Sequence, residues 1–349
     1  MHPDWLTFLT AQGALIEQNR VLHFGQPAAE LAQAESGTIL VDLSHLGLIH
    51  FSGEDTQHFL QSQLSCDIHS VSSEKAGYGG YCTPKGRLLS SFLVWQAVSD
   101  NSCLMQLPAE QVEAIAKRLK MFVLRARVII QDHTGNCIRI GIAGKNTHTL
   151  LQNVLPDTIL STEPLTVTAI PDGQIICHSE NRFEILVNPA RAPSLWKQLS
   201  DQARCAGAAV WDWLEIREGI PAIFKVTREE FVPQMINLDA IGGVSFRKGC
   251  YPGQEIVART QYLGKIKRRL YCAHLDVDSG INAAAGDGLF STETGDQSCG
   301  MIVNAAPSPA GGIDVLAVIQ SGSTETGSIH WKTPDGPQLI ILPLPYAIT

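Results

Sequence analysis

A cysteine placed between two cations and the expected start of a helix is the feature of this sequence best suited to chemistry. Cys250 follows Arg247 and Lys248, and Gly253 leads into a short helix that we expect over residues 254 to 259. Positive charge and a helix N-terminus both favour the thiolate over the thiol, and the thiolate is the nucleophile and the metal ligand. Cys250 is therefore a candidate reactive thiol. The alternative is a tight turn in which this cysteine is only a small buried apolar residue.

The eight residues from Lys248 to Glu255, KGCYPGQE, resemble the K-G-C-[FY]-x-G-Q-E signature of the YgfZ family. These are folate-binding proteins related to the aminomethyltransferase, or T-protein, of the glycine cleavage system. The flanking runs 237–239, 242–246 and 257–259 also resemble the family, whereas T-proteins have K-x-D-F-x-G-x-E here and lack the cysteine. The resemblance implies a functional thiol motif, with Cys250 as the working thiol and Lys248 beside it. Its other members are Arg247, Tyr251, Gln254, Glu255 and two glycines expected to allow a tight turn, Gly249 and Gly253.

A hairpin is expected over residues 77 to 98, because Pro84 and Gly86 punctuate the apolar runs on either side. In T-proteins, by resemblance, the corresponding hairpin carries paired acids just past the glycine, and one of them is the catalytic aspartate. This chain has Leu88-Leu89-Ser90-Ser91 at that place. Aminomethyl transfer relies on protonation chemistry, so the loss of the carboxylate argues against a transferase.

The run from Ala208 to Gly219 is expected to be a helix that stops before Pro221. It resembles the T-protein segment iEaGiP, whose Glu hydrogen-bonds the pterin. Arg217 stands at that position, and a guanidinium can only donate hydrogen bonds, whereas a carboxylate accepts them from a pterin edge. Glu215 and Glu218 are the neighbouring carboxylates that could replace it. Together with these three residues, the resemblance offers Asn237, Arg259 and Tyr81 as candidate folate contacts.

The order of expected elements predicts an α+β protein. Strands are expected near 128–131, 138–143, 165–170, 174–177 and 183–187, and helices near 145–155 and 189–203. Two successive β-α-β groups of this kind predict tandem ferredoxin-like lobes within residues 1–260, the T-protein-like folate-binding region. Short apolar runs separated by turn residues predict a small antiparallel β-barrel over residues 261–349. The T-protein resemblance implies that these parts form a three-domain ring.

The N-terminal part is expected to hold two helices within residues 1–35 and one buried strand from Thr38 to Phe51. The acids after Gly53 suit the first turn of a helix, where the helix dipole favours negative charge. The run from Asp42 to Gly47, DLSHLG, resembles the D-x-S-H-x-G segment of T-proteins.

A further helix is expected from Pro108, with an apolar face that runs to Phe122 and Val123. Five cations decorate it and its exit: Lys117, Arg118, Lys120, Arg125 and Arg127. They are interpreted as a solvated face, or alternatively as a guide for an anionic ligand such as a folate glutamate tail or a nucleic acid.

Composition limits the class of protein. A chain of 349 residues with 44% hydrophobic and 17% charged residues favours a folded protein of two or three domains over a disordered one. A net charge of -8 makes direct nucleic-acid binding an unfavoured function. No leader-like N-terminus and no apolar run of about 18 residues is found, so we expect a cytoplasmic monomer without a membrane segment.

The nine cysteines are scattered without a CxxC pair, which indicates reduced thiols. The pairs Cys66 with His69, His133 with Cys137, and Cys272 with His274 lack a second pair at zinc-site spacing, so we expect no metal site.

Two functions follow from these observations. The YgfZ resemblance implies a tetrahydrofolate-binding accessory protein that supports iron–sulfur cluster assembly or repair in client enzymes, and indirectly tRNA methylthiolation. Cys250 would then make a transient iron–sulfur contact, because a lone thiol cannot hold a cluster that needs about four thiolates. The alternative is a folate-dependent aminomethyl or one-carbon transferase. Direct tRNA binding through the cations of 117–127 and 265–269 is a third, weaker hypothesis.

Overall fold

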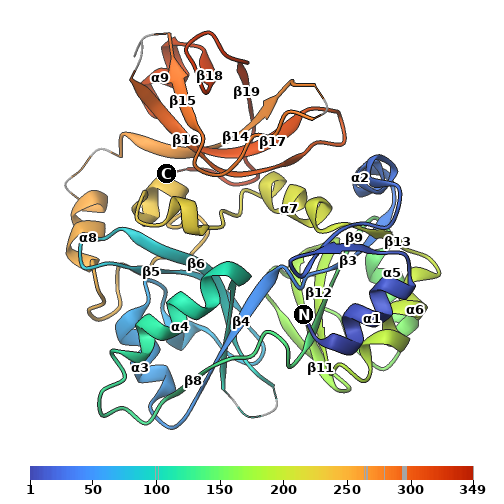
Figure 1. The fold of residues 1–349 in the computed structure, drawn as a ribbon. Coiled ribbons are helices and arrows are strands. Elements are labelled where there is room, and N and C mark those ends of the chain that lie inside the picture. The colour runs from blue at the N-terminus through green and yellow to red at the C-terminus, as the bar shows by residue number, and fades with distance from the viewer. Residues whose placement is uncertain are drawn as a thin grey trace. The chain divides into compact units, whose positions relative to one another are not determined.

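The computed structural model describes residues 1–98, 100, 102–262, 264, 266–278, 280–292 and 297–348, and it shows a mixed α+β fold with several sheets (Figure 1). The predicted α+β class is confirmed. Two compact units interleave along the chain. One unit is Met1–Phe59, His69–Gly77 and Leu93–Trp211, and the other is Leu60–Ile68, Tyr78–Phe92 and Asp212–Thr349. Each unit is therefore assembled from three separate stretches of sequence.

The first unit contains a six-stranded sheet. Its order is β10 (Val167–Ile170), β11 (Gly173–Ser179), β12 (Arg182–Val187), β9 (Ile138–Gly144), β3 (Thr38–Asp42) and β13 (Arg204–Ala206). Neighbours pair antiparallel except β13, which runs parallel to β3. Successive side chains of a strand point to opposite faces, so Ile138, Ile140 and Ile142 of β9 all enter one apolar core.

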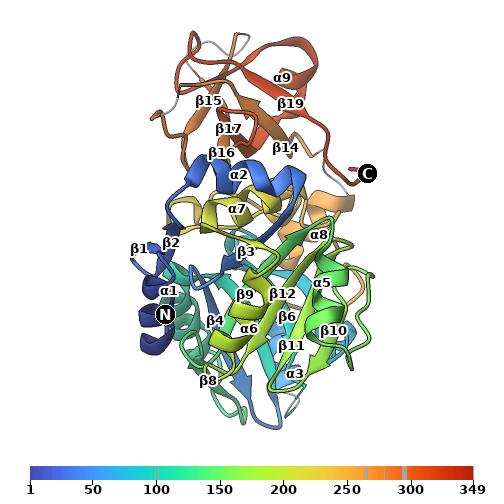
Figure 2. The ribbon, with the colours of Figure 1, turned by 90° about the vertical axis from the view of Figure 1, so that its right-hand side faces the viewer.

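Three helices cover that apolar face and share its core: α1 (Pro3–Ala11), α5 (Thr147–Val154) and α6 (Ala192–Ser200). The unit also contains α2 (Pro27–Ser36), which lies against β13 and β3, and α4 (Val112–Lys120), which packs on a different sheet. On α6, Ala192, Leu195, Trp196 and Leu199 recur at helical spacing and are buried against the sheet, where Trp196 meets Trp5 edge-on at 5.5 Å. Figure 2 shows α5 and α6 in front of the strands they cover. The strands predicted over 128–187 and the two helices among and after them are confirmed.

The single strand predicted from Thr38 to Phe51 is wrong, because the segment forms two strands in different sheets. β3 ends at Asp42, and β4 (Leu46–Ser52) begins after a turn. Asp42 causes the break: its buried carboxylate accepts hydrogen bonds from the Ser44 amide at 3.1 Å, the Ser44 hydroxyl at 2.9 Å and the Trp5 indole at 2.7 Å. Burial nonetheless raises the pKa of Asp42.

The predicted hairpin is confirmed within a five-stranded sheet. The order is β5 (Gly77–Cys82), β6 (Leu88–Gln96), β7 (Cys103–Pro108), β4 and β8 (Ile129–Asp132). Strand β7 was not predicted. The helix after Pro108 is confirmed, but it begins with a 3-10 turn (Ala109–Gln111) and stops at Lys120. Phe122 is therefore not part of its buried face, and its side chain is 43% exposed.

The N-terminal segment contains a small hairpin between its two predicted helices. β1 (Leu15–Glu17) pairs with β2 (Arg20–His23) across Gln18 and Asn19, which have φ of 48° and 64°. Positive φ at both central residues is the backbone of a type I′ turn, whose twist suits a two-residue connection. The helix predicted after Gly53 is confirmed as α3 (Thr56–Gln63).

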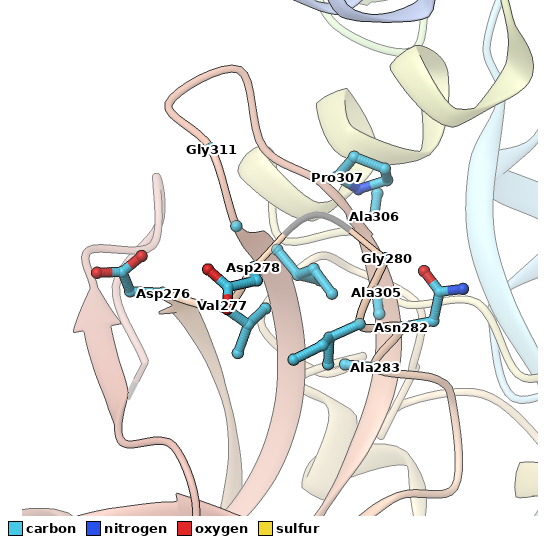
Figure 3. Close-up of a pocket in the computed structure, with 13 residues that line it drawn as sticks. Asp276, Val277, Asp278, Gly280, Asn282, Ala283, Ala305, Ala306, Pro307 and Gly311 are labelled. Atoms are coloured by element: carbon cyan, nitrogen blue, oxygen red, sulfur yellow. The ribbon is translucent and has the colours of Figure 1, made fainter.

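The C-terminal part of the second unit is a six-stranded antiparallel sheet. Its order is β18 (Ile329–Trp331), β15 (Gly288–Ser291), β16 (Ser298–Pro307), β17 (Ile313–Gln320), β14 (Arg268–Leu275) and β19 (Leu339–Leu342). Alternate residues of β17, from Ile313 to Ile319, are buried in its core. A hollow of about 660 Å³ opens beside Asp276, Asn282 and Pro307 (Figure 3), and no predicted site residue lines it.

The rest of the second unit is helical and irregular. It contains α7 (Ala208–Arg217), α8 (Gln254–Tyr262), α9 (Ser321–Thr326) and the 3-10 turns Lys225–Thr227 and Pro233–Ile236; a further 3-10 turn, Ile68–Ser70, begins where its first stretch ends. Both helices predicted here, α7 and α8, are confirmed. Among the residues that the structure describes, no helix is long and apolar enough to cross a membrane.

Candidate functional site

The thiol loop, residues 247–254, presents Cys250 at the surface of the second unit. All nine cysteines lie in the described part of the chain and are free. Cys250 is exposed, whereas six others are buried and Cys137 and Cys205 are half-buried. Burial raises the pKa of the Cys66 and Cys82 thiols to about 12, which keeps them protonated at neutral pH. The loop therefore holds the thiol that solvent and partners reach most easily.

Lys248 anchors the thiol loop to a distant part of the chain. Its ammonium group donates hydrogen bonds to the Leu64 carbonyl at 2.8 Å and the Cys66 carbonyl at 2.7 Å, and it lies 5.4 Å from the ring centre of Tyr251. Burial lowers the pKa of Lys248 to about 8. Two of its three N–H groups are thus used to fix the loop.

The two glycines of the motif have different surroundings. Gly253 has φ +83°, and a Cβ atom there would lie 2.5 Å from the Thr83 carbonyl oxygen and 2.6 Å from Gly86 Cα. Only glycine fits this left-handed backbone and this approach to the hairpin turn. Gly249 has no such φ, and a Cβ added to it would meet nothing within 4 Å. Gly253 has the backbone and the close contact that require glycine, whereas the surroundings of Gly249 do not require one, and its role in a tight turn stays a prediction.

The remaining motif residues divide into supports and surface groups. Tyr251 is buried, and burial raises the pKa of its phenol. Gln254 donates a 3.4 Å hydrogen bond to the Lys248 carbonyl, which closes the loop at the start of α8. Arg247 and Glu255 are exposed, and Glu255 lies in the first turn of α8, where the helix dipole favours an acid.

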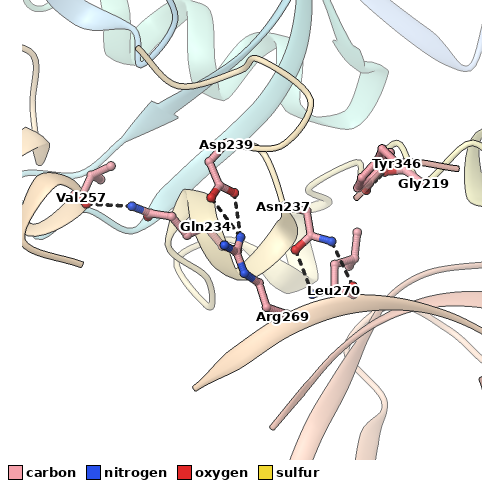
Figure 4. A network of polar contacts seen from close by, with 8 residues as sticks. All are labelled: Gly219, Gln234, Asn237, Asp239, Val257, Arg269, Leu270 and Tyr346. Atoms are coloured by element: carbon pink, nitrogen blue, oxygen red, sulfur yellow. Dashed lines mark hydrogen bonds and ion pairs between the residues drawn. The ribbon is translucent and has the colours of Figure 1, made fainter. Parts of the chain in front are cut away.

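A buried polar network contacts α8 through Gln234 and Val257 (Figure 4). Gln234 donates a 2.7 Å hydrogen bond to the Val257 carbonyl of α8. Arg269 of β14 pairs with both oxygens of Asp239, at 2.8 and 3.0 Å, and donates to the Gln234 carbonyl at 2.8 Å. Both members of this ion pair are more than nine-tenths buried. The segment before the thiol loop is therefore fixed to the C-terminal sheet.

The hairpin residues Leu88–Ser91 are all buried. The Ser91 hydroxyl donates to the Pro221 carbonyl at 2.9 Å and accepts the Ile223 amide at 3.0 Å. The Leu88 amide donates to the Phe231 carbonyl at 2.8 Å. This segment thus holds a neighbouring loop in place and itself carries no carboxylate.

The candidate folate contacts lie on several elements. Glu215 and Glu218 are half-buried and one turn apart on and just past α7, and Arg217 between them is exposed and 3.9 Å from Asp314. Arg259 is exposed on α8 and Tyr81 is buried on β5. Each folate role stays a prediction.

Asn237 has a clear structural task. It is fully buried with φ 55°, its amide nitrogen donates to the Leu270 carbonyl at 3.0 Å, and its amide oxygen accepts the Leu270 amide at 3.4 Å (Figure 4). These two hydrogen bonds hold the segment before the thiol loop against β14. They explain why Asn237 is buried, and its folate contact stays a prediction.

A second anchoring group was missed from the sequence. Asp314, 3% exposed on β17, accepts hydrogen bonds from the Trp213 indole at 2.8 Å and lies 2.7 Å from His274 Nδ1. It thereby fixes α7, which carries Glu215 and is followed directly by Glu218, to the C-terminal sheet. The signal was present, since an acid within an apolar strand, IDVLAVIQ, needs a buried partner.

Known proteins that are similar to this chain have the same fold. A family model described as the GCVT N-terminal domain matches residues 13–241. The crystal structure of glycine cleavage system aminomethyltransferase T from Bartonella henselae is similar, with a TM-score of 0.76 at 14% identity over 98% of this chain and 96% of that chain. The fold therefore places the molecule in the class of proteins built like aminomethyltransferases.

The curated relatives are more specific. A tRNA-modifying protein YgfZ from Colwellia psychrerythraea is 31% identical over 294 residues, which cover 80% of this chain and 89% of the relative. One from Sodalis glossinidius is 29% identical over 326 residues, covering 92% and 97%. The chain belongs to the YgfZ family, as the motif at residues 248–255 predicted.

Proposed function

We propose that this protein binds a tetrahydrofolate and supports the assembly or repair of iron–sulfur clusters in other enzymes, and through them tRNA modification by methylthiolation. The observation that carries the proposal is the exposed Cys250 on an anchored loop, in a fold whose usual acid positions, Leu88–Ser91, hold buried neutral residues. The relatives named tRNA-modifying protein YgfZ support the connection to tRNA.

The chemistry of one thiol favours a helper over a cluster carrier. A thiolate is a soft ligand that can occupy one coordination position of an iron atom, whereas a stable cluster is held by about four. The buried cysteines of this chain cannot serve as the remaining ligands of a cluster bound at the surface. Cys250 is therefore suited to transient ligation of a cluster that belongs to a client enzyme.

The residues of α7 suit a folate. Glu215 and Glu218 offer two carboxylates one turn apart, and a carboxylate accepts the paired N–H groups of a pterin edge. Asp314 holds this helix through Trp213, so the carboxylates are on a rigid element. Tyr81, Asn237 and Arg259 remain weaker candidates for the same ligand.

The second candidate is a folate-dependent aminomethyl or one-carbon transferase, which the fold itself favours. It requires a group that moves a proton at the reacting centre. Measurable turnover of methylene- or aminomethyl-tetrahydrofolate by the pure protein would favour it, and none is expected.

We also infer the larger arrangement from the resemblance: two ferredoxin-like lobes within residues 1–260, a β-barrel over 261–349, and a three-domain ring in a cytoplasmic monomer. Light scattering of the eluting protein tests the monomer, and X-ray scattering in solution tests the ring.

Replacement of Cys250 by Ser tests the function. In a host lacking the native gene, C250S should leave tRNA methylthiolation and cluster-enzyme activity under oxidative stress at the level of the empty vector. Cys137→Ser, at a half-buried position with a raised pKa, is the matched control and should restore both. Calorimetry should show tetrahydrofolate binding by both variants. Full restoration by C250S would refute the proposal.

A further inference from the structure

A basic groove of about 590 Å³ lies along α8 in the second unit. Three cations line it: Arg259 on α8, Lys267 just before β14, and Arg268 at its first residue. Its apolar wall includes Val232, Met235 and Ile266. Lys265, which also belongs to this basic run in the sequence, lies outside the described residues.

Within the described part of the chain, no ion pair involves Arg259, Lys267 or Arg268. The whole chain has a net charge of -8, so a cluster of unpaired positive charge is a local departure from its surroundings. Such a patch attracts negative charge and orients an approaching partner.

The apolar wall restricts what the negative partner is. Ile256 lines the same groove, lies on the same face of α8 as Arg259 and Thr260, and is 38% exposed. A nucleic-acid backbone would use the cations but would leave the apolar side chains in contact with water or phosphate. A protein segment with both acidic and apolar side chains satisfies both parts of the groove.

The groove and the reactive thiol share one rigid element. α8 begins at Gln254, four residues after Cys250, and its nine residues extend about 14 Å. Ile256 also packs against Gly86, next to the contact between Gly86 and Gly253 that fixes the loop. A chain bound in the groove is therefore held within a helix length of the thiol.

We propose that the basic groove docks an acidic, partly apolar segment of a protein partner. The inference rests on the proposed function and deepens it, because docking along α8 would bring a client's cluster site to Cys250. It also gives the cations of residues 267–268 a task other than binding tRNA.

Two synthetic twelve-residue peptides labelled with fluorescein test the groove by fluorescence anisotropy with the full-length protein. The first combines glutamates with leucines, and the second has the same glutamates with serines in place of the leucines. We expect the first to bind saturably and the second about 10-fold more weakly. Equal binding of the two peptides would overturn the role of the apolar wall.

Charge reversal locates the site. The triple variant Arg259→Glu, Lys267→Glu, Arg268→Glu should bind the first peptide at least about 10-fold more weakly. The matched control Lys117→Glu, Lys120→Glu, Arg125→Glu reverses three cations on and after α4 and should bind as the wild type does. Equal loss in both variants, or in neither, would overturn the proposal. So would a tRNA that binds the wild type more tightly than the peptide and is released by the groove variant.

Two further readouts separate this proposal from the function on which it rests. The double variant Lys267→Glu, Arg268→Glu, which leaves the candidate folate contact Arg259 in place, should retain tetrahydrofolate binding and fast labelling of Cys250 while it restores tRNA methylthiolation only weakly in cells. If C250S restores methylthiolation fully, the proposed function fails, and the peptide measurements then decide the groove by themselves.

Discussion

The thiol loop and the hairpin segment Leu88–Ser91 lie in the same unit but have opposite properties. The loop presents a nucleophile to solvent, and its backbone is fixed by Lys248 and Gly253. The hairpin segment is buried, and the Ser91 hydroxyl bonds to a neighbouring loop. The hairpin turn also provides the surface on which Gly253 rests.

The difference shows that two proteins with the same fold can carry their candidate reactive groups on different elements. In T-proteins, by the sequence resemblance, the hairpin carries acids and the loop lacks a cysteine. Here the hairpin has become a support, and the exposed sulfur belongs to the loop. The proposed function therefore rests on residues of a loop, while the fold around them is shared.

The largest expected effect is on thiol reactivity. Cys250→Ser should slow the reaction of the native protein with iodoacetamide at pH 7.5 by about 100-fold or more, because the other thiols are protected and largely protonated. Cys82→Ser, which replaces a buried thiol beneath the loop, should leave the fast phase unchanged. If C250S still shows fast labelling, and mass spectrometry locates the label on another cysteine, then Cys250 is not the most accessible thiol of the protein.

Removal of one member of the Asp239–Arg269 ion pair should have the largest effect on stability. Asp239→Ala should lower the free energy of unfolding by about 3–5 kcal/mol, because it leaves a buried guanidinium without its charge partner. The double variant Asp239→Leu, Arg269→Met should cost less than the single one. Urea unfolding measures both, and a loss below about 1 kcal/mol for Asp239→Ala would contradict the anchoring role.

The two glycines of the loop provide a matched pair. Gly253→Ala should lower the free energy of unfolding by about 1–3 kcal/mol, since its φ of +83° and its contact with the hairpin turn both exclude a Cβ atom. Gly249→Ala should change it by less than about 0.5 kcal/mol. Equal effects would mean that the loop does not depend on the hairpin.

The smallest effect concerns pH. The pKa of Lys248 is lowered from 10.5 to about 8, so between these values the unfolded chain binds more protons than the folded one. The stability of the wild type relative to Lys248→Met should therefore rise as pH increases from about 8 to 10.5, and should be constant below it. A relative stability that falls over this range in urea unfolding would contradict the buried position of the ammonium group.

The sequence predicted local structure well where one pattern decided it. Helix α6 and strand β9 follow from apolar spacing alone, and the motif around Cys250 identified the family. The break between β3 and β4 could not be read from apolar content, because the Asp42 side chain replaces strand pairing with a turn. The accessible thiol was anticipated, but its fixation by Lys248 was not, since that depends on carbonyl groups far away in the chain.

Contacts between distant residues also distinguish positions that look alike in the motif. Gly253 and Gly249 look equivalent in KGCYPGQE, and only the position of Gly86 distinguishes them. Asp239 and Arg269 have no local signature of their ion pair, because they lie on different elements. The ligand roles of Glu215 and Glu218 remain predictions that folate titration can decide.

The bonds from Lys248 to Leu64 and Cys66 join residues 184 and 182 positions apart. During synthesis at about 5–20 residues per second, the early segment waits roughly 10 to 40 s for its lysine to leave the ribosome. In that interval Cys66 and the apolar residues beside it lack their final covering. A nascent chain of this kind would expose apolar surface for longer than its short local contacts suggest, which makes chaperone binding during synthesis an expected consequence.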